Sequence, residues 1–255
     1  MSSSTSKPTV AIFGATGGTG LSILKNSLAS GHTVNVLART PSKLSSLSTQ
    51  YPNLHVIQGD IYDNNSIKET LVLNNRVVDV VVTGIGMVLQ QKGMGFTSSD
   101  KNICENGTKN ILAAISELEC QSSPPITLPT GGPKLILLST TGISSKSRDI
   151  PIPMIPLYHW MLALPHADKK KMESVVIDSG RRWVLVRPSL LTDGEAKGLE
   201  RVRAGVEVPG NKEEGKHAVG YTIRRDDVGT WVYEECIRNA GAWEKWEGKC
   251  VSLTY

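Results

Sequence analysis

A glycine-rich turn near the N-terminus has the composition of a phosphate-binding site. Its glycines Gly14, Gly17 and Gly20 belong to the segment GATGGTG, which follows the apolar run TVAIF and precedes a helical pattern. Glycine permits the tight turn, lets the backbone approach a phosphate oxygen and lets the helix pack on the strand. Because a helix N-terminus presents unpaired N–H groups and a partial positive charge, the turn predicts a site for the diphosphate of a dinucleotide. We expect contacts from Gly14, Thr16, Gly17, Gly18, Thr19 and Gly20.

The residues after the second apolar run indicate which dinucleotide binds. An acid about 20 residues after such a turn accepts a hydrogen bond from the ribose 2′-hydroxyl of NAD, whereas an arginine suits a 2′-phosphate. Here the run TVNVLA is followed by Arg39, Thr40 and, one helical turn later, Lys43. The first acid in the chain is Asp60, so residues 1–59 offer no carboxylate to the hydroxyl. The pattern favours NADP(H), the alternative being that Arg39 is a solvated loop cation.

Charge and cysteine content exclude several classes of protein. The chain has 28 Lys and Arg against 24 Asp and Glu, a net charge of +4, which is too small for a general nucleic-acid or membrane-surface binder. Its four cysteines form no CxxC pair, so we expect reduced thiols, no disulfide framework and no metal site. No apolar run approaches the ~18 residues of a membrane span, and MSSSTSKP lacks the apolar centre of a signal peptide. We therefore expect a cytoplasmic protein.

Short apolar runs alternate with helical patterns over the first 190 residues. This order is typical of a parallel sheet covered on both faces. It predicts an α/β protein with a Rossmann-like, doubly wound parallel sheet, helices on both faces and a small C-terminal part that covers the substrate. Residues 1–7 are expected to be a disordered lead-in, and residues 8–255 a single domain. The expected strands are 9–13, 33–38, 55–58, 78–83, 134–139 and 183–187, and the expected helices are 18–30, 41–48, 65–73, 100–118 and 168–179.

Two segments interrupt this alternation. Residues 121–133 are rich in Pro, Gly and Ser and are expected to be a solvated connector. Residues 142–166 combine prolines with large apolar side chains, among them Met154, Tyr158 and Trp160. Such a loop either packs against the sheet edge or forms the wall of a substrate pocket. We expect pocket segments near 142–166 and 190–222.

The motifs and their order resemble the short-chain dehydrogenase/reductase superfamily. Within it, the chain is most similar to the atypical NmrA-like and biliverdin/flavin-reductase-like branch. The resemblance spans residues 9–231, and the segments that carry it are GATGGTG (14–20), LART-P (37–41), GD (59–60), GTKNILAAI (107–115), LLSTTG (137–142), VRPSLL (186–191) and RRDDVG (224–229).

The resemblance implies further cofactor contacts along the sheet. Asp60 and Ile61 match the pair that meets the adenine ring, although Asp60 could instead cap a turn or helix. The segment Gly84, Ile85 and Gly86 matches the turn along which the cofactor ribose passes. Near the nicotinamide, the resemblance implies Thr140, Lys169, Pro188, Leu190 and Leu191.

The catalytic residues match this superfamily less well. It typically uses a Ser or Thr after the fifth strand, matched here by Thr141, together with a Tyr and Lys in a YxxxK arrangement. Lys169 matches the lysine, but the residue four positions before it is Pro165, which cannot donate a proton. Tyr158, His159 or His166 could supply the proton instead, since imidazole titrates near neutral pH. Orientation alone can remove ~7–11 kcal/mol of barrier, so a missing acid does not exclude an enzyme.

These patterns together predict an NADP(H)-dependent oxidoreductase. We expect it to reduce a small or medium apolar carbonyl, enone or quinone-like compound of the kind found in secondary metabolism. Two alternatives remain open: an NmrA-like regulator that senses NADP without turnover, and a redox-silent isomerase or cyclase. We expect a small-molecule substrate, no nucleic-acid or membrane partner, and a monomer or weak dimer.

Overall fold

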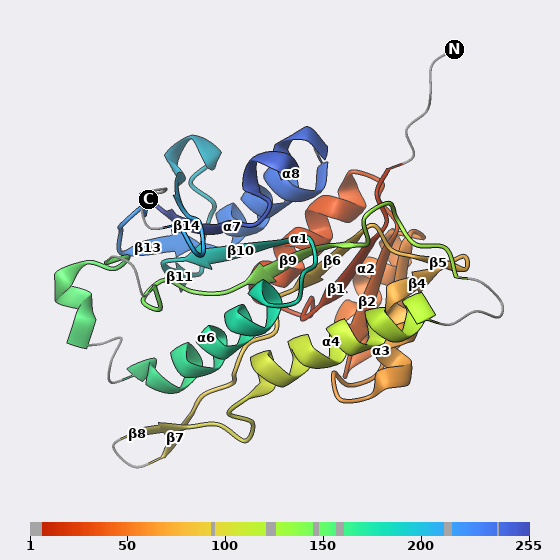
Figure 1. The fold of residues 1–255 in the computed structure, drawn as a ribbon, viewed down its shortest axis with the longest axis horizontal. Coiled ribbons are helices and arrows are strands. Elements are labelled where there is room, and N and C mark those ends of the chain that lie inside the picture. The colour runs from red at the N-terminus through yellow and green to blue at the C-terminus, as the bar shows by residue number, and fades with distance from the viewer. Residues whose placement is uncertain are drawn as a thin grey trace.

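An eight-stranded sheet forms the centre of the molecule (Figure 1). The computed structural model describes residues 7–92, 95–120, 126–144, 148–156, 161–211, 216–238 and 240–255. The strand order is β12-β14-β10-β9-β6-β1-β2-β3. All neighbours are parallel except β12, which runs antiparallel to β14. The strands are β1 (Val10–Phe13), β2 (Val34–Ala38), β3 (Leu54–Gln58), β6 (Val80–Thr83), β9 (Lys134–Leu138), β10 (Trp183–Pro188), β12 (Arg203–Glu207) and β14 (Cys250–Thr254).

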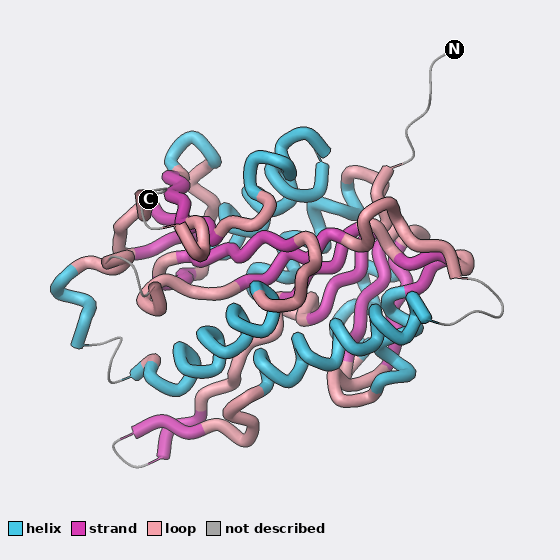
Figure 2. The backbone as a smooth tube through the Cα atoms, in the orientation of Figure 1, coloured by secondary structure: helices cyan, strands magenta, loops and turns pink. Residues whose placement is uncertain are grey.

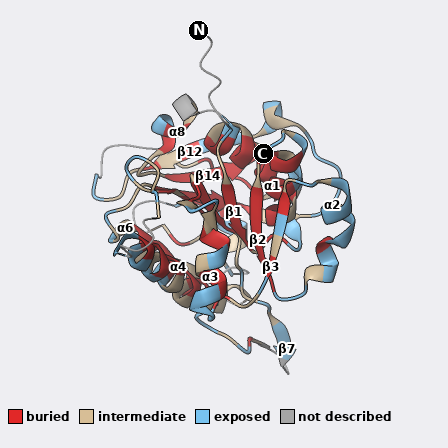
Figure 3. Cartoon of the chain, turned by 90° about the vertical axis from the view of Figure 1, so that its right-hand side faces the viewer, coloured by how far each residue is buried: buried red, intermediate tan, exposed pale blue. Residues whose placement is uncertain are grey.

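Six of these strands lie where the apolar runs predict them, with ends shifted by one or two residues. Every residue of β1, β2, β6 and β10 is buried, because helices cover both faces and leave no polar side to alternate with. The prediction of a Rossmann-like α/β fold is confirmed. Figure 3 shows the buried strands between the inner sides of the helices.

Two hydrophobic cores lie on opposite faces of the sheet. One face carries α1 (Gly18–Ala29), α7 (Arg225–Val232) and α8 (Ala240–Trp246), and the other carries α3 (Asn64–Leu71), α4 (Ile103–Cys120) and α6 (Ala163–Ile177) (Figures 1 and 2). The segment predicted as a helix over 41–48 is a 3-10 turn, Pro41–Leu44, followed by α2 (Ser45–Gln50). Its Leu44 and Leu47 pack in the same core as α1.

Helix α6 begins earlier than the pattern predicts, at Ala163 rather than at residue 168. Pro165 is tolerated there because the first N–H groups of a helix have no partner within it. The helix ends at Ile177, and Gly180 has a φ of +67°, as expected for a glycine stop. His166 therefore lies on the first turn of a helix and not on a loop.

The elements after residue 188 have no counterpart among the predicted ones. They include the pair β11 (Leu190–Thr192) and β13 (Thr222–Arg224), a 3-10 turn at Leu199–Arg201 and a π-helical turn at Tyr233–Arg238. Earlier in the chain, two small hairpins form from β4 (Val72–Leu73) with β5 (Arg76–Val77) and from β7 (Gln90–Lys92) with β8 (Gly95–Thr97). The aromatic residues Trp231, Tyr233, Trp243 and Trp246 belong to the core beside α1.

Two findings concern membrane spans and metal ions in the described part of the chain. No helix there is both long enough and apolar enough to cross a membrane. The same residues contain no group of three or more His, Cys, Asp or Glu side chains placed to hold a metal ion.

Candidate cofactor and substrate site

A cavity of about 650 Å³ opens at the carboxyl ends of β1, β2, β3 and β6. Ligands of open α/β sheets bind at this edge. Eleven of the residues predicted to bind cofactor line it, namely Gly14, Thr16, Gly17, Arg39, Thr40, Lys43, Asp60, Ile61, Gly84, Ile85 and Gly86. The structure thus brings together, from four strand ends, residues that the motifs assigned separately.

The glycine turn has the close contacts that its motif predicts. Gly14 has a φ of +88°, and a Cβ placed on it would lie 2.8 Å from the carbonyl carbon of Gly84. A Cβ on Gly20 would lie 2.2 Å from the Gly14 oxygen, so only glycine lets α1 pack this closely on the turn. A Cβ on Gly17 or Gly86 would meet no atom within 4 Å. Because both line the cavity, their lack of a side chain keeps this space open to a ligand.

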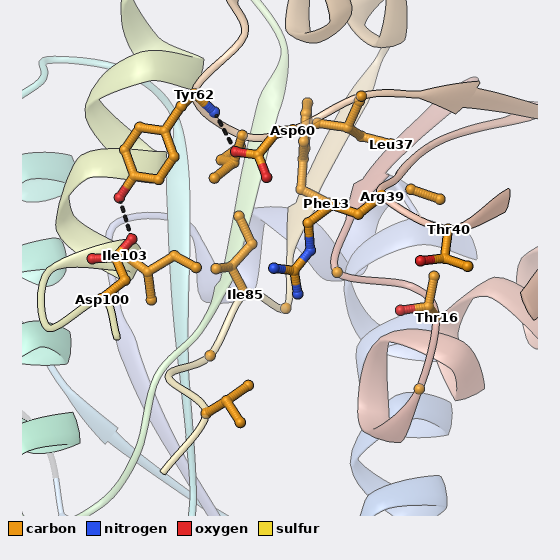
Figure 4. A pocket seen from close by; sticks show the side chains of 18 of the residues that line it. Phe13, Thr16, Leu37, Arg39, Thr40, Asp60, Tyr62, Ile85, Asp100 and Ile103 are labelled. Atoms are coloured by element: carbon orange, nitrogen blue, oxygen red, sulfur yellow. Dashed lines mark hydrogen bonds between the residues drawn. The ribbon is translucent and has the colours of Figure 1, made fainter. Parts of the chain in front are cut away.

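Two cations stand at the nucleotide end without partners. Arg39 and Thr40 are exposed after β2, and Lys43 follows on the 3-10 turn. Among the described residues, neither the Arg39 nor the Lys43 side chain has an ion-pair or hydrogen-bond partner. Figure 4 shows the Arg39 guanidinium projecting into the cavity. The charge of both residues is thus available to an anionic ligand.

A tyrosine that the motifs did not single out bridges two segments of the cavity wall. The Tyr62 hydroxyl donates to Asp100 Oδ2 at 2.5 Å (Figure 4), and Asp60 Oδ1 accepts from the Tyr62 N–H at 3.0 Å. Asp60 therefore both lines the cavity and caps a turn. Partial burial and the Asp100 carboxylate raise the pKa of Tyr62. Other lining residues that sequence reasoning missed are Val88, Ser98, Ser99 and Ile103, which follow the fourth predicted strand without a motif to mark them.

Lys169 lies on α6 beside the ends of β6 and β9. We call this region the nicotinamide side, after the role that the resemblance implies for it. The Lys169 ammonium group donates to the carbonyl oxygens of Ile85 at 2.7 Å and Leu138 at 2.6 Å, which join the ends of β6 and β9. The neighbouring carboxylate of Asp168 is buried and accepts from the N–H groups of Cys104 and Glu105 at the start of α4, both at 2.9 Å. Asp168 thereby fixes α6 against α4, and with it the position of Lys169.

The other residues predicted for catalysis and for the nicotinamide are placed as follows. Thr141 is fully buried, and its hydroxyl donates to the Pro188 carbonyl at 3.4 Å. Thr140 is half-buried and donates to the Thr141 carbonyl at 3.1 Å. His166 is half-buried, as are Leu190 and Leu191 on β11. These residues, like Gly18, Thr19 and Lys169, lie outside the lining of the nucleotide cavity.

Part of the predicted substrate loop falls outside the described residues. This applies to Tyr158, His159 and Trp160. Met154 ends a 3-10 turn, Ile152–Met154, where it is half-buried and Ile152 is exposed. The roles proposed for these residues stay predictions.

A buried charge network lies beneath the nicotinamide side. The Arg187 guanidinium of the VRP segment forms two hydrogen bonds with Glu173 of α6, at 2.9 and 2.6 Å, and one with Glu207 at 2.7 Å. Burial alone would raise the pKa of Glu207, but hydrogen bonds with His217 and Ser144 and the charge of Arg187 lower it to about 2. The network ties α6, β10 and β12 together. Arg187 is therefore a structural residue within a motif that the resemblance associates with the cofactor.

Comparison with known proteins identifies the family. A sequence profile described as NAD(P)H-binding matches residues 14–238. "Reductase pytE" of Aspergillus terreus is 42% identical and covers 99% of this chain and 100% of its own length. "Oxidase pynE" of Aspergillus niger is 34% identical, with coverages of 98% and 99%.

Solved structures agree with the fold. A short-chain dehydrogenase/reductase from Veillonella parvula, determined in complex with NADP, has a TM-score of 0.68 at 12% identity and covers 97% of this chain and 94% of its own. The resemblance inferred from the motifs is confirmed. The chain therefore belongs to the NAD(P)H-binding family and is an oxidoreductase.

Proposed function

We propose that the protein is an NADP(H)-dependent reductase of a small or medium apolar carbonyl, enone or quinone-like compound. The observation that carries the preference for NADP(H) is the pair of unpartnered cations, Arg39 and Lys43, at the nucleotide end of the cavity. A guanidinium binds phosphate oxygens in a bidentate manner, and an ammonium one helical turn away adds a point charge. The first 59 residues contain no carboxylate that would repel a 2′-phosphate.

Apolar residues of two segments support the proposed substrate class. Leu190 and Leu191 are half-buried on β11, and the exposed Ile152 precedes Met154 on the pocket loop. An apolar wall of this kind binds the carbon skeleton of a substrate better than a charged one. The fungal relatives named reductase and oxidase support redox chemistry. When bound, the reduced nicotinamide supplies a hydride.

The chain's own residues would orient the reactants. Lys169 is held where β6 and β9 end, and it is the residue proposed to bind the nicotinamide ribose in exchange for one of its carbonyl partners. Thr140, which is less buried than Thr141, is the accessible hydroxyl of the STT segment. Proton delivery to the substrate is assigned to Tyr158, His166 or solvent.

Titration of tryptophan fluorescence with NADPH and NADH tests the cofactor preference. Wild-type protein should bind NADPH more tightly than NADH. Arg39→Ala should lower the affinity for NADPH by about tenfold to a hundredfold and leave the affinity for NADH unchanged. Lys25→Ala removes another cation of the first 59 residues, on α1, and should leave both affinities as they are. Equal wild-type affinities for the two cofactors would contradict the preference.

Incubation with NADPH and a panel of quinones, enones, aldehydes and flavins tests the reaction. We expect loss of NADPH absorbance with an apolar acceptor. Tight NADPH binding without consumption of NADPH with any compound would instead favour the NADP sensor or the redox-silent isomerase.

The proposal also includes a monomer or weak dimer and a cytoplasmic location. Light scattering tests the oligomeric state, and fluorescence microscopy of a tagged chain tests the location.

A further inference from the structure

A cation outside the predicted site lies against the glycine turn. Arg225 is the first residue of α7, remote in sequence from Gly18, the first residue of α1. Gly18 has a φ of +56°, and a Cβ placed on it would lie 3.5 Å from Cδ and 3.6 Å from Nε of Arg225. The Arg225 side chain therefore runs beside the N-terminus of α1. This is the end of the helix that attracts phosphate.

The packing of α7 on α1 fixes Arg225 in this place (Figure 1). A Cβ on Gly229 would lie 2.4 Å from the Ser22 side chain, so the glycine lets the two helices approach closely. The Ser22 hydroxyl donates to the Asp226 carbonyl at 3.3 Å. The N-terminal half of α7 is thus held against the N-terminal half of α1. This packing accounts for Gly229 and places Arg225 beside Gly18.

The present partner of Arg225 is easily exchanged. Its guanidinium pairs with the Asp193 carboxylate at 2.7 Å, but the side chains of Arg225 and Asp193 are 32% and 89% exposed. Such exposed pairs contribute little to stability. The main-chain carbonyl of Asp193 accepts separately from Arg224. Arg225 can therefore leave the carboxylate without releasing the backbone of this segment.

We propose that Arg225 is a further ligand of the cofactor diphosphate and exchanges the Asp193 carboxylate for a phosphate oxygen when the dinucleotide binds. The inference rests on the proposed cofactor site. Among the described residues that line the cavity, Arg39 and Lys43 are the cations, and both are assigned to the 2′-phosphate. The diphosphate would otherwise meet only uncharged groups of the turn, whereas an arginine adds charge and a matching geometry.

Calorimetric titration with four probes separates Arg225 from the 2′-phosphate site. NADPH, NADH and ADP-ribose carry the diphosphate, and 2′-AMP does not. Arg225→Ala should lower the affinity for NADPH, NADH and ADP-ribose by about tenfold and leave the affinity for 2′-AMP unchanged. Arg39→Ala should instead lower the affinity for NADPH and 2′-AMP only. If Arg39→Ala does not lower the affinity for NADPH and 2′-AMP, the proposed NADP preference is contradicted. The role of Arg225 is still tested in that case, because NADH and ADP-ribose carry the diphosphate without a 2′-phosphate.

Three further variants distinguish a ligand from a structural residue. Arg225→Lys should keep most of the ADP-ribose affinity, since charge is retained. Asp193→Asn removes the competing carboxylate and should tighten ADP-ribose binding about two- to threefold. Arg238→Ala, which removes an exposed arginine paired with Glu234, should change nothing. The proposal is overturned if Arg225→Ala changes the affinity for ADP-ribose by less than about twofold. It is also overturned if the variant lowers the affinities for 2′-AMP and ADP-ribose equally.

Discussion

The nucleotide half and the nicotinamide half of the site differ in how their polar groups are satisfied. Around the cavity, Arg39 and Lys43 have no partner among the described residues. On the other side of β6, Lys169 already donates to two carbonyl oxygens, and Arg187 is bonded to two buried carboxylates. Arg39 and Lys43 can bind an anion by adding interactions, whereas Lys169 and Arg187 would have to exchange interactions that hold the fold together.

This difference separates two kinds of evidence for function. Unpartnered cations that line a cavity are available to an anionic ligand, because no group of the fold pairs with them. Buried charges that are fully paired are explained by the fold itself. Affinity should therefore be most sensitive to substitutions in the nucleotide half, and stability to those in the nicotinamide half.

The largest expected effect is on stability, from Arg187→Met. The variant leaves Glu173 and Glu207 buried without their cation, which should lower the free energy of unfolding by about 3–5 kcal/mol. Urea denaturation measures it. Arg181→Met removes a partly exposed pair with Glu119 and should cost less than about 1 kcal/mol. Equal losses in the two variants would contradict the idea that burial makes the Arg187 network important for stability.

Lowering the pH should weaken the same Arg187 network. The pKa of Glu207 is lowered from 4.5 to about 2, so its contribution to stability is complete above pH 4.5 and is lost as the pH falls toward 2. The lost contribution is up to about 3 kcal/mol. Urea unfolding across this pH range should show it, and Glu207→Gln should flatten the dependence. Glu117→Gln, at an exposed position, is the control. If the dependence of unfolding free energy on pH is unchanged in Glu207→Gln but reduced in Glu117→Gln, Glu207 is not the group responsible.

Lys169→Met tests whether the Lys169 contacts stabilise the fold, with its neighbour on α6, Lys170, as the control. It leaves the carbonyl groups of Ile85 and Leu138 without their donor, which should cost about 1–3 kcal/mol of unfolding free energy in addition to the loss of turnover. Lys170→Met changes an exposed neighbour and should leave thermal unfolding and turnover as in wild type. Full stability of Lys169→Met would show that the carbonyl contacts do not support the fold.

The smallest expected effect belongs to Tyr62→Phe at the cavity wall. Loss of the hydrogen bond to Asp100 at a half-exposed position should weaken NADPH binding only a few-fold, equivalent to about 0.5–1 kcal/mol. Fluorescence titration measures this change. Tyr221→Phe, at an exposed tyrosine outside the cavity lining, serves as the control and should bind as wild type does.

Local patterns were sufficient to predict much of the fold and many of the residues that line the cavity. The glycines, Arg39 and Lys43 lie within single strand-turn-helix units, where spacing in sequence determines spacing in space. The C-terminal strand β14 was not predicted, because its position between β10 and β12 depends on pairing with residues far away in the chain. A short buried run such as CVSLT has no periodicity to mark it.

Contacts between helices and loops were also beyond the sequence. Tyr62 and Asp100 are 38 residues apart, and no motif connects them. Asp168 looks like an ordinary helix residue, yet it caps a different helix. The partners of Lys169 are main-chain carbonyls, which carry no sequence signal at all. These features depend on tertiary packing rather than on local propensity.

The strand order also has a consequence for how the chain folds. Strands β3, β2, β1 and β6 come from one continuous stretch, whereas β14 must insert between β10 and β12 after long loops close. Since non-local pairing slows folding, we expect the nucleotide half to form early and β14 to dock in the slowest step. Trp243 and Trp246, on the helix just before β14, should report that step in stopped-flow refolding. A tryptophan signal that is complete before the far-ultraviolet signal of the sheet would reverse this order.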